Sequence, residues 1–233
     1  GSVPKARRDT SPGLLLAAAY PDRIGRRRGA VERRYALTNG RGAEFIDADR
    51  LAQQEFIVAV ELDDRDREAR IRLAAALDRS DIESVCGERI ERRDEVEWSS
   101  RDEAVTARRV ERLDAIVLSE KPLNPPPTEL ARAAMLTGLQ VMGAVALPWD
   151  DDCRQLQARV RFVRALPAEQ AARWPDLDDA ALLATAEDWL APWLDGVTRR
   201  AHLARLPLHE ALRQQLGHDR LRRLDELAPT HLT

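Results

Sequence analysis

The sequence predicts an α+β protein in which a small β-barrel with one short helix is followed by an α-helical domain. Short segments of alternating apolar and polar residues fill the first half, as in strands. After the proline run at residues 125–127 the apolar period becomes helical. A chain of 233 residues with 44% apolar side chains can bury sizeable cores. We therefore divide the chain into a linker at residues 1–12, a helix and β domain at residues 13–123, and an α-helical domain at residues 124–233.

The N-terminal segment predicts a linker and one helix. The chain starts with Gly1 and no methionine, which resembles the scar of a protease cleavage. We therefore expect an excised part of a longer protein, with residues 1–12 as cloning scar and linker. Residues 13–19 predict a helix that ends before Pro21, because proline disfavours helical geometry in its predecessor. The apolar run is too short to span a membrane, and arginines rather than a signal-peptide cleavage site follow it.

The β portion is predicted from alternation and turn residues. Residues 33–46 read as a hairpin around Asn39 and Gly40, where positive φ is easily reached. Further strands are predicted at residues 56–62 and 69–77, and residues 78–87 read as a short helix closed by Gly87. Residues 92–118 predict two or three strands that turn at Ser99 and Ser100. Five or six strands with one small helix match the OB fold, a five-stranded, partly open barrel.

The second half predicts amphipathic helices at residues 128–144, 149–166, 176–194 and 206–229, the last as one helix or two. We expect the first helix to stop at Gly143. The residues expected to face inward are Leu130, Ala134, Leu136 or Thr137, and Val141 in the first helix, Leu156, Val160 and Val163 in the second, and Leu182, Leu183, Ala186 and Leu190 in the third.

Charge singles out the N-terminal end as the place for an anionic partner. The net charge of −3 argues against a wholly basic nucleic-acid binder, but residues 1–41 carry ten basic and three acidic side chains. Arginine's planar fork suits phosphate oxygens, and nearby glycines let backbone N–H groups approach a ligand. The candidate nucleic-acid-binding residues are Arg23, Arg26, Arg27, Arg28, Arg34, Asn39 and Arg41. An ordinary solvated basic loop is the alternative reading.

The sequence shows no carrier of catalysis. It contains no phosphate-binding loop, no nucleophile elbow and no His-Glu-x-x-His motif. The acidic runs at residues 150–152 and 176–179 stand at helix starts, where we expect caps rather than a metal site. His202 and His209 flank Pro207 and predict no ligand pair, so the catalytic and metal sets are predicted to be empty.

Aromatic residues are expected to serve the cores. The five tryptophans predict packing rather than base stacking. The candidates in the β portion are Tyr35, Phe45, Phe56 and Trp98. Stacking should contribute little to binding unless Tyr35 or Phe45 faces a groove.

Four strings carry a resemblance to a known family: "SPGLLLAAAYPDRIGRRRG", "RYALTNGRGAEF", "RRVERLDAIVLSEKPL" and "LPLHEALRQQLGHDRLRRLDELAPTHL". In this order they resemble the region after the motor in the HrpB branch of bacterial DEAH-box ATP-dependent RNA helicases. The resemblance runs from about Ser11 to Leu232, with residues 13–19 as the last helix of the family's helical bundle.

The resemblance implies a parent that hydrolyses ATP with Mg²⁺ through motor motifs outside this chain, which itself needs no cofactor. It implies an OB-like portion that helps to hold single-stranded RNA, with residues 22–29 and 38–42 as RNA-facing surface. The expected partners are single-stranded RNA, bound weakly through phosphates, and the motor and helical-bundle domains of the same parent, in the cytoplasm. The alternative is a structural or protein-interaction scaffold whose arginines pair with acidic surfaces of the motor and which binds no nucleic acid.

Overall fold

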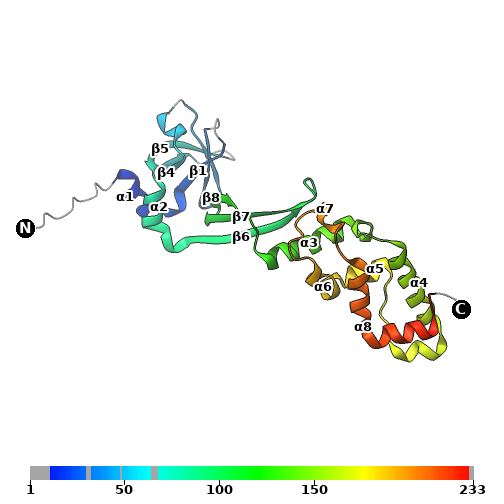
Figure 1. Ribbon diagram of the computed structural model, residues 1–233. Coiled ribbons are helices and arrows are strands. Elements are labelled where there is room, and N and C mark those ends of the chain that lie inside the picture. The colour runs from blue at the N-terminus through cyan, green and yellow to red at the C-terminus, as the bar shows by residue number, and fades with distance from the viewer. Residues whose placement is uncertain (1–10, 30–32, 48, 64–67, 231–233) are drawn as a thin grey trace, which may run out of the picture. The chain divides into compact units, whose positions relative to one another are not determined.

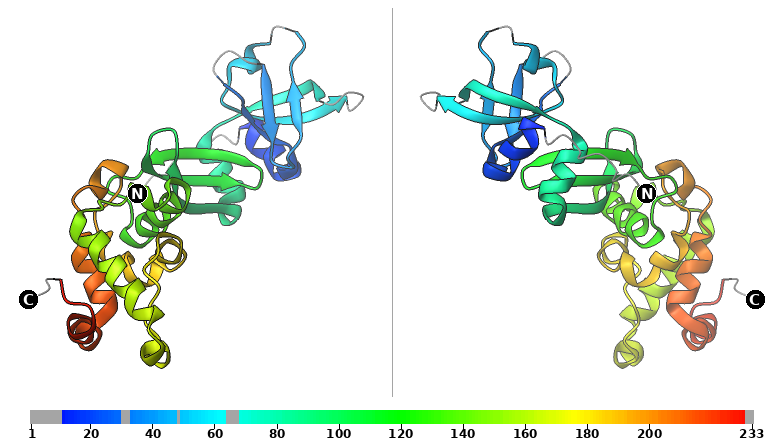
Figure 2. Two further views of the ribbon diagram at one scale, coloured as in Figure 1. Left: turned by 90° about the vertical axis from the view of Figure 1, so that its right-hand side faces the viewer. Right: turned by 90° about the vertical axis from the view of Figure 1, so that its left-hand side faces the viewer.

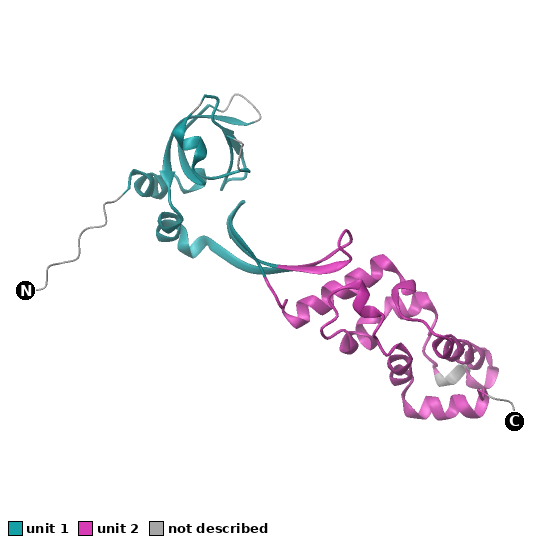
Figure 3. Ribbon diagram, turned by 45° about the horizontal axis from the view of Figure 1, so that its top comes forward, with its two compact units in different colours: residues 1–95, 108–122 teal, residues 96–107, 123–233 magenta. Residues whose placement is uncertain are grey.

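The computed structural model describes residues 11–29, 33–47, 49–63 and 68–230 (Figure 1). The predicted linker therefore lies almost wholly outside the described residues. The chain forms two compact units, coloured separately in Figure 3. Unit 1 comprises residues 1–95 and 108–122, and unit 2 comprises residues 96–107 and 123–233.

Unit 1 contains a closed five-stranded barrel, which Figure 3 shows as a ring of strands. Its strands are β1 (Ile24–Arg27), β2 (Arg34–Leu37), β3 (Gly42–Glu44), β4 (Phe56–Asp63) and β5 (Ala69–Leu77). The order is β1-β2-β3-β5-β4, and β1 closes the ring by pairing with β4. The β3–β5 pair is parallel and the others are antiparallel. The predicted hairpin is confirmed by the β2–β3 pair, with Gly40 at a φ of 84° in its turn.

Side chains from alternate strand positions fill the barrel. Tyr35 and Leu37 of β2 are fully buried together with Ile57 of β4. Phe56, next to Ile57, instead joins a second cluster outside the barrel. Successive strand residues point to opposite faces, so the apolar run of β4 reflects burial on both of its faces.

Two helices contact each other beside the barrel, and the first of them packs against β4 and β5. Helix α1 (Pro12–Ala19) begins at Ser11, whose hydroxyl accepts the N–H of Leu14 at 3.1 Å, and it ends before Pro21 as predicted. Helix α2 (Arg79–Cys86) stops before Gly87 as predicted. However, Gly87 has a φ of −53° and continues into a 3-10 turn, so it does not form a left-handed cap.

A three-stranded antiparallel sheet follows, formed by β6 (Ile90–Ser99), β7 (Ala104–Leu113) and β8 (Ile116–Pro122) in that order. The predicted turn after Ser99 is confirmed at residues 100–103, where Glu103 takes a φ of 46°. The hairpin tip, residues 96–107, belongs to unit 2.

Unit 2 is otherwise helical. Its helices are α3 (Thr128–Met142), α4 (Asp151–Ala165), α5 (Asp179–Ala184), α6 (Ala186–Trp189), α7 (Arg200–Leu203) and α8 (Leu208–Leu227). Helices α4 and α8 lie side by side in both views of Figure 2. The predicted third helix is interrupted at Thr185, and the last one is kinked at Gly217, which has a φ of 76°.

The prediction for the buried face of α3 is wrong in part. Leu130 and Val141 are exposed, and Met135 and Leu139 are buried instead. The buried face includes Gly138, where a Cβ would come within 2.4 Å of the Trp98 ring. Which face of α3 is buried thus depends on the glycine that lets the indole approach the helix. The apolar period of the sequence does not reveal this contact.

The other inward faces agree better with expectation. In α4, Leu156, Val160 and Val163 are buried as predicted. In the third predicted helix Leu182 and Leu190 are buried and Leu183 is only half-buried. Within the described part of the chain, no helix is both long and apolar enough to cross a membrane.

Candidate nucleic-acid interface

The candidate residues lie along β1 and at its two ends. Arg26 and Arg27 are in β1 itself, a strand that was not among those predicted from the sequence. Arg23 precedes the strand in a 3-10 turn (Pro21–Arg23), and Arg28 follows it. These four arginines are close in sequence, but they lie before, within and after β1.

The first end of the barrel brings Arg23, Asn39 and Arg41 together. The backbone N–H of Asn39 donates to the carbonyl of Asp22 at 3.3 Å, which ties the β2–β3 turn to the 3-10 turn. Nη1 of Arg23 donates to the carbonyl of Val60 at 2.7 Å. The Asn39 side chain accepts the N–H of Arg41 at 3.0 Å, and both residues are exposed.

Arg26 and Arg27 extend to different neighbours. Nη1 of Arg26 donates to the carbonyl of Val117 in β8 at 2.6 Å, and its Nη2 lies 3.4 Å from a Glu55 carboxylate oxygen. Nη1 of Arg27 lies 3.5 Å from the carbonyl of Ala52. Adjacent strand residues point to opposite faces, so these two guanidinium groups do not form one patch.

The second end of β1 holds Arg28 and Arg34. The N–H of Arg28 donates to the carbonyl of Arg34 at 2.7 Å, and the Arg28 side chain is exposed. Nε of Arg34 lies 3.6 Å from Glu44 and 3.4 Å from Glu68. Arg34 is therefore partly neutralised, whereas no ion pair joins Arg28 to another described residue.

Of the predicted aromatic candidates, Tyr35 lies in the barrel core, whereas Phe45 lines a cavity of about 530 Å³ together with Arg70 and Arg72. Tyr35 is fully buried and Phe45 nearly so, with their rings edge to face at 5.8 Å. The Tyr35 hydroxyl lies 2.8 Å from the carbonyls of both Leu51 and Gln54, and burial raises its pKa to about 12. Both rings are largely buried, so stacking on them is still expected to contribute little.

The three-stranded sheet carries a set of ion pairs that sequence reasoning did not find. Arg109 holds Asp94 at 2.8 Å, and its hydrogen bond lowers the pKa of that carboxyl. Arg92 lowers the pKa of Glu111 in the same way, against the opposing effect of partial burial, and Arg79 of α2 also pairs with Glu111. The alternating charges are visible in the sequence, but their partners depend on the β6–β7 register.

The acidic runs of unit 2 have structural partners. Asp150 caps α4, accepting the N–H of Cys153 at 2.8 Å, which confirms the predicted cap. Asp176 and Asp178 pair with arginines of α4. Among the described residues, no group of three or more His, Cys, Asp or Glu side chains could hold a metal ion.

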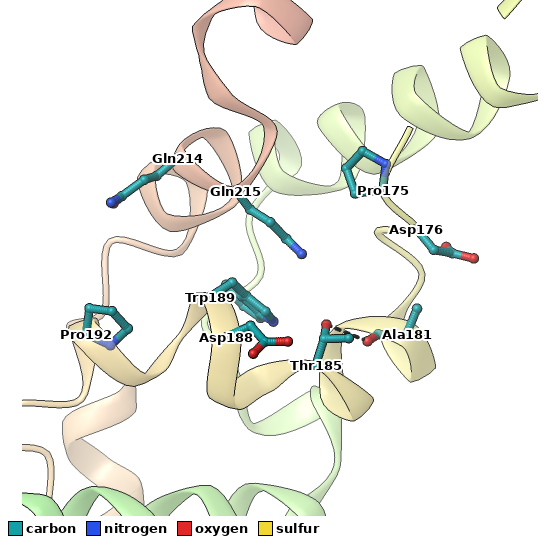
Figure 4. Close-up of a pocket in the computed structure, with 9 residues that line it drawn as sticks. All are labelled: Pro175, Asp176, Ala181, Thr185, Asp188, Trp189, Pro192, Gln214 and Gln215. Atoms are coloured by element: carbon teal, nitrogen blue, oxygen red, sulfur yellow. Dashed lines mark hydrogen bonds between the residues drawn. The ribbon is translucent and has the colours of Figure 1, made fainter. Parts of the chain in front are cut away.

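Figure 4 shows a cavity of about 520 Å³ in unit 2, lined by Trp189, Gln214, Gln215, Asp188 and Thr185 among others. The Thr185 hydroxyl donates to the carbonyl of Ala181. This hydroxyl therefore donates to a backbone carbonyl and not to a side-chain base.

Comparison with known proteins finds similarity to one helicase family. Residues 89–123, which contain the three-stranded sheet, match the family model "ATP-dependent RNA helicase HrpB, connector region". The chain is 34% identical over 221 residues to the ATP-dependent RNA helicase HrpB of Escherichia coli (strain K12), covering 94% of this chain and 27% of that protein.

Two crystal structures of E. coli HrpB are also similar. One, described as a DExH-box NTPase, is 34% identical over 95% of this chain with a TM-score of 0.44. The other, described as a DEAH/RHA helicase, is 32% identical over 94% of this chain with the same TM-score. This chain covers 27% of each. By its sequence, the chain belongs to the HrpB family, as a region that spans about a quarter of the length of its E. coli relative.

Proposed function

We propose that this chain is a non-catalytic region of an ATP-dependent RNA helicase that guides single-stranded RNA and supports the motor and helical-bundle domains of its parent. ATP and Mg²⁺ act in the motor domains of that parent, in the cytoplasm. The proposal is supported by the name of the E. coli relative and by the charge of residues 1–41, which is +7 in a chain of net charge −3.

The observation that carries the proposal is the exposure of Arg28 and Arg41 at opposite ends of the β1–β2 pair. Backbone hydrogen bonds hold both positions: the Arg28 N–H donates to the Arg34 carbonyl, and the Arg41 carbonyl accepts the Leu37 N–H. Phosphate contacts from such arginines provide affinity without sequence readout, so binding is expected to be weak and sensitive to salt.

The test is fluorescence anisotropy of a labelled single-stranded RNA, titrated with the chain over a salt series. Replacing Arg28 and Arg41 together by alanine removes charge without breaking the hydrogen bond that Arg26 makes to β8. We expect weaker binding and a salt slope lower by roughly 0.7 for each lost phosphate contact. The matched control is Arg101→Ala, an exposed arginine in the β6–β7 turn of unit 2, which should leave both quantities unchanged. Equal affinity and slope for the double variant and wild type would contradict the assignment.

The scaffold alternative is favoured by a different observation. Several candidate guanidinium groups are already engaged within the barrel, including Arg26 with Glu55 and Arg34 with Glu44 and Glu68. A scaffold would bind the separately produced motor domains and show no RNA binding even at low salt. Measuring both interactions on the same preparation separates the two functions.

A further inference from the structure

Tyr20 differs from the other aromatic side chains of unit 1. The described residues of that unit hold four aromatic rings, of which Tyr35, Phe45 and Phe56 are buried. Tyr20 is 36% exposed and was not among the aromatic candidates predicted from the sequence. A single exposed ring is common on protein surfaces, so exposure alone assigns nothing to it.

The Tyr20 backbone is held on both sides. Its N–H donates to the carbonyl of Leu16 at 2.8 Å as the C-cap of α1, and its carbonyl accepts the N–H of Arg23 at 3.0 Å. Pro21 follows directly and restricts the backbone further. The backbone that carries the ring is therefore fixed by the fold, which reduces the conformational entropy lost when a ligand binds.

A cation is fixed over the Tyr20 ring. The Arg23 guanidinium carbon lies 5.2 Å from the ring centroid, within the range of a cation–π interaction. The same guanidinium is anchored by its hydrogen bond to the carbonyl of Val60 at 2.7 Å. Arginine and aromatic ring thus form one unit with a defined orientation.

The β2–β3 turn places polar groups beside this unit. The Thr38 hydroxyl donates to the carbonyl of Pro21 at 2.9 Å, and the Asn39 N–H donates to that of Asp22 at 3.3 Å. The exposed side chains of Asn39 and Arg41 accordingly lie at the barrel end that carries Tyr20. This end combines an aromatic ring, guanidinium groups and an amide.

We propose that Tyr20 is a stacking platform for one unpaired base of single-stranded RNA, with phosphates of the same strand near Arg23 and Arg41. The proposal rests on the proposed RNA-binding function and adds a base contact to it. Aromatic stacking on a base tolerates any sequence, and it requires a base whose face is free. The bases of a duplex stack on their neighbours, so this site selects single strands. The Asp22 carboxylate is also exposed here and weakens phosphate binding, which increases the relative contribution of stacking.

The test compares Tyr20→Leu with Tyr20→Phe in anisotropy titrations of single-stranded RNA. Leucine keeps an apolar side chain and removes the ring, while phenylalanine keeps the ring and removes only the hydroxyl. We expect Tyr20→Leu to weaken binding about 5-fold or more, the factor that ~1 kcal/mol of lost stacking produces, and Tyr20→Phe to stay within about 2-fold. The salt slope should be unchanged in both, because no phosphate contact is removed.

Two further measurements sharpen the test. An abasic RNA of equal length should bind wild type and Tyr20→Leu alike, and a duplex should show no difference between them. The far-UV circular dichroism of both variants should match wild type, which confirms an intact barrel.

The outcomes distinguish the two proposals. If wild type binds RNA and Tyr20→Leu binds it equally well, the stacking proposal is wrong and RNA binding through arginines stands. A loss of affinity accompanied by a lower salt slope also overturns stacking, because the variant has then displaced Arg23. If wild type binds no RNA at low salt, the proposed function itself fails, and the stacking proposal fails with it.

Discussion

Replacing Gly13 by alanine should loosen α1 from the barrel. A Cβ at residue 13 would lie 2.1 Å from the carbonyl oxygen of Ala76 in β5. That oxygen belongs to a backbone held in the β4–β5 pair, where Ala76 is paired with Ile57, so α1 has to move by about 1 Å to restore normal contact. Overpacking of this kind costs ~1–3 kcal/mol, and alanine's better helix propensity returns at most ~1 kcal/mol. We expect a net loss of about 1–2 kcal/mol in the stability of unit 1.

The two cysteines make this loss measurable in one unit at a time. Cys86 is buried in unit 1 and Cys153 in unit 2, and both are free thiols. Burial raises the pKa of Cys86, and it raises that of Cys153 to about 11, so native thiols react slowly near pH 8. Pulsed alkylation over a urea series, read by mass spectrometry, therefore follows the unfolding of each unit. For Gly13→Ala the Cys86 midpoint should fall by roughly 0.5–1 M urea and the Cys153 midpoint should stay.

Gly87→Ala is the matched control in the same unit. Gly87 has right-handed φ and ψ values of −53° and −39°, and nothing lies within 4 Å of the position that a Cβ would occupy there. Alanine fits this conformation without strain and makes the unfolded chain less flexible. Unit 1 should therefore gain ~0.4–1 kcal/mol of stability, and the Cys86 midpoint should move to a higher urea concentration. If Gly13→Ala left the Cys86 midpoint unchanged or raised it, the close packing of α1 on β5 would be refuted.

Two predictions concern unit 2. Asp150→Ala should lower the stability of unit 2 by ~0.5–2 kcal/mol, because the N–H of Cys153 loses its capping acceptor. Asp150→Asn should retain most of that stability. Equal Cys153 labelling midpoints for wild type and the alanine variant would contradict this prediction. Hydrogen bonds from Arg223 and then from Trp174 hold the pKa of Glu169 below its ordinary value, so the stability it adds is present above about pH 4.3 and is lost as pH falls further. Urea unfolding between pH 6 and pH 3 should therefore show a steeper loss in wild type than in Glu169→Gln, and parallel curves would rule this contribution out.

Local patterns accounted for much of the fold. The Asn39-Gly40 turn, the end of α3 at Gly143 and the buried face of α4 follow from turn chemistry, positive φ and the helical period. The close approach of Trp98 to Gly138 did not follow, because it depends on residues 40 positions apart. Strand β1 was also missed, since two of its four residues are arginines and its pairing partners are distant in sequence.

The candidate site was predictable in composition and not in arrangement. The excess of basic residues in the first 41 positions is a property of the sequence. Whether two arginines share a surface depends on strand direction, and β1 sends Arg26 towards β8 and Arg27 towards the turn containing Ala52. Tyr20 was overlooked because an aromatic residue at a helix end looks like any other core residue until its exposure is known.

The arginines of the N-terminal end are distributed between two ends of the barrel, which affects how they can bind an anionic ligand. Arginines that are distant in sequence come together, with Arg23 near Arg41 at one end of the barrel and Arg28 beside Arg34 at the other. The two ends are separated by the four residues of β1, about 13 Å of extended chain. A flexible single strand can reach both ends, whereas a single phosphate group cannot. Affinity should therefore be distributed over several weak contacts, and the loss of any one arginine should cost less than the combined loss of one from each end.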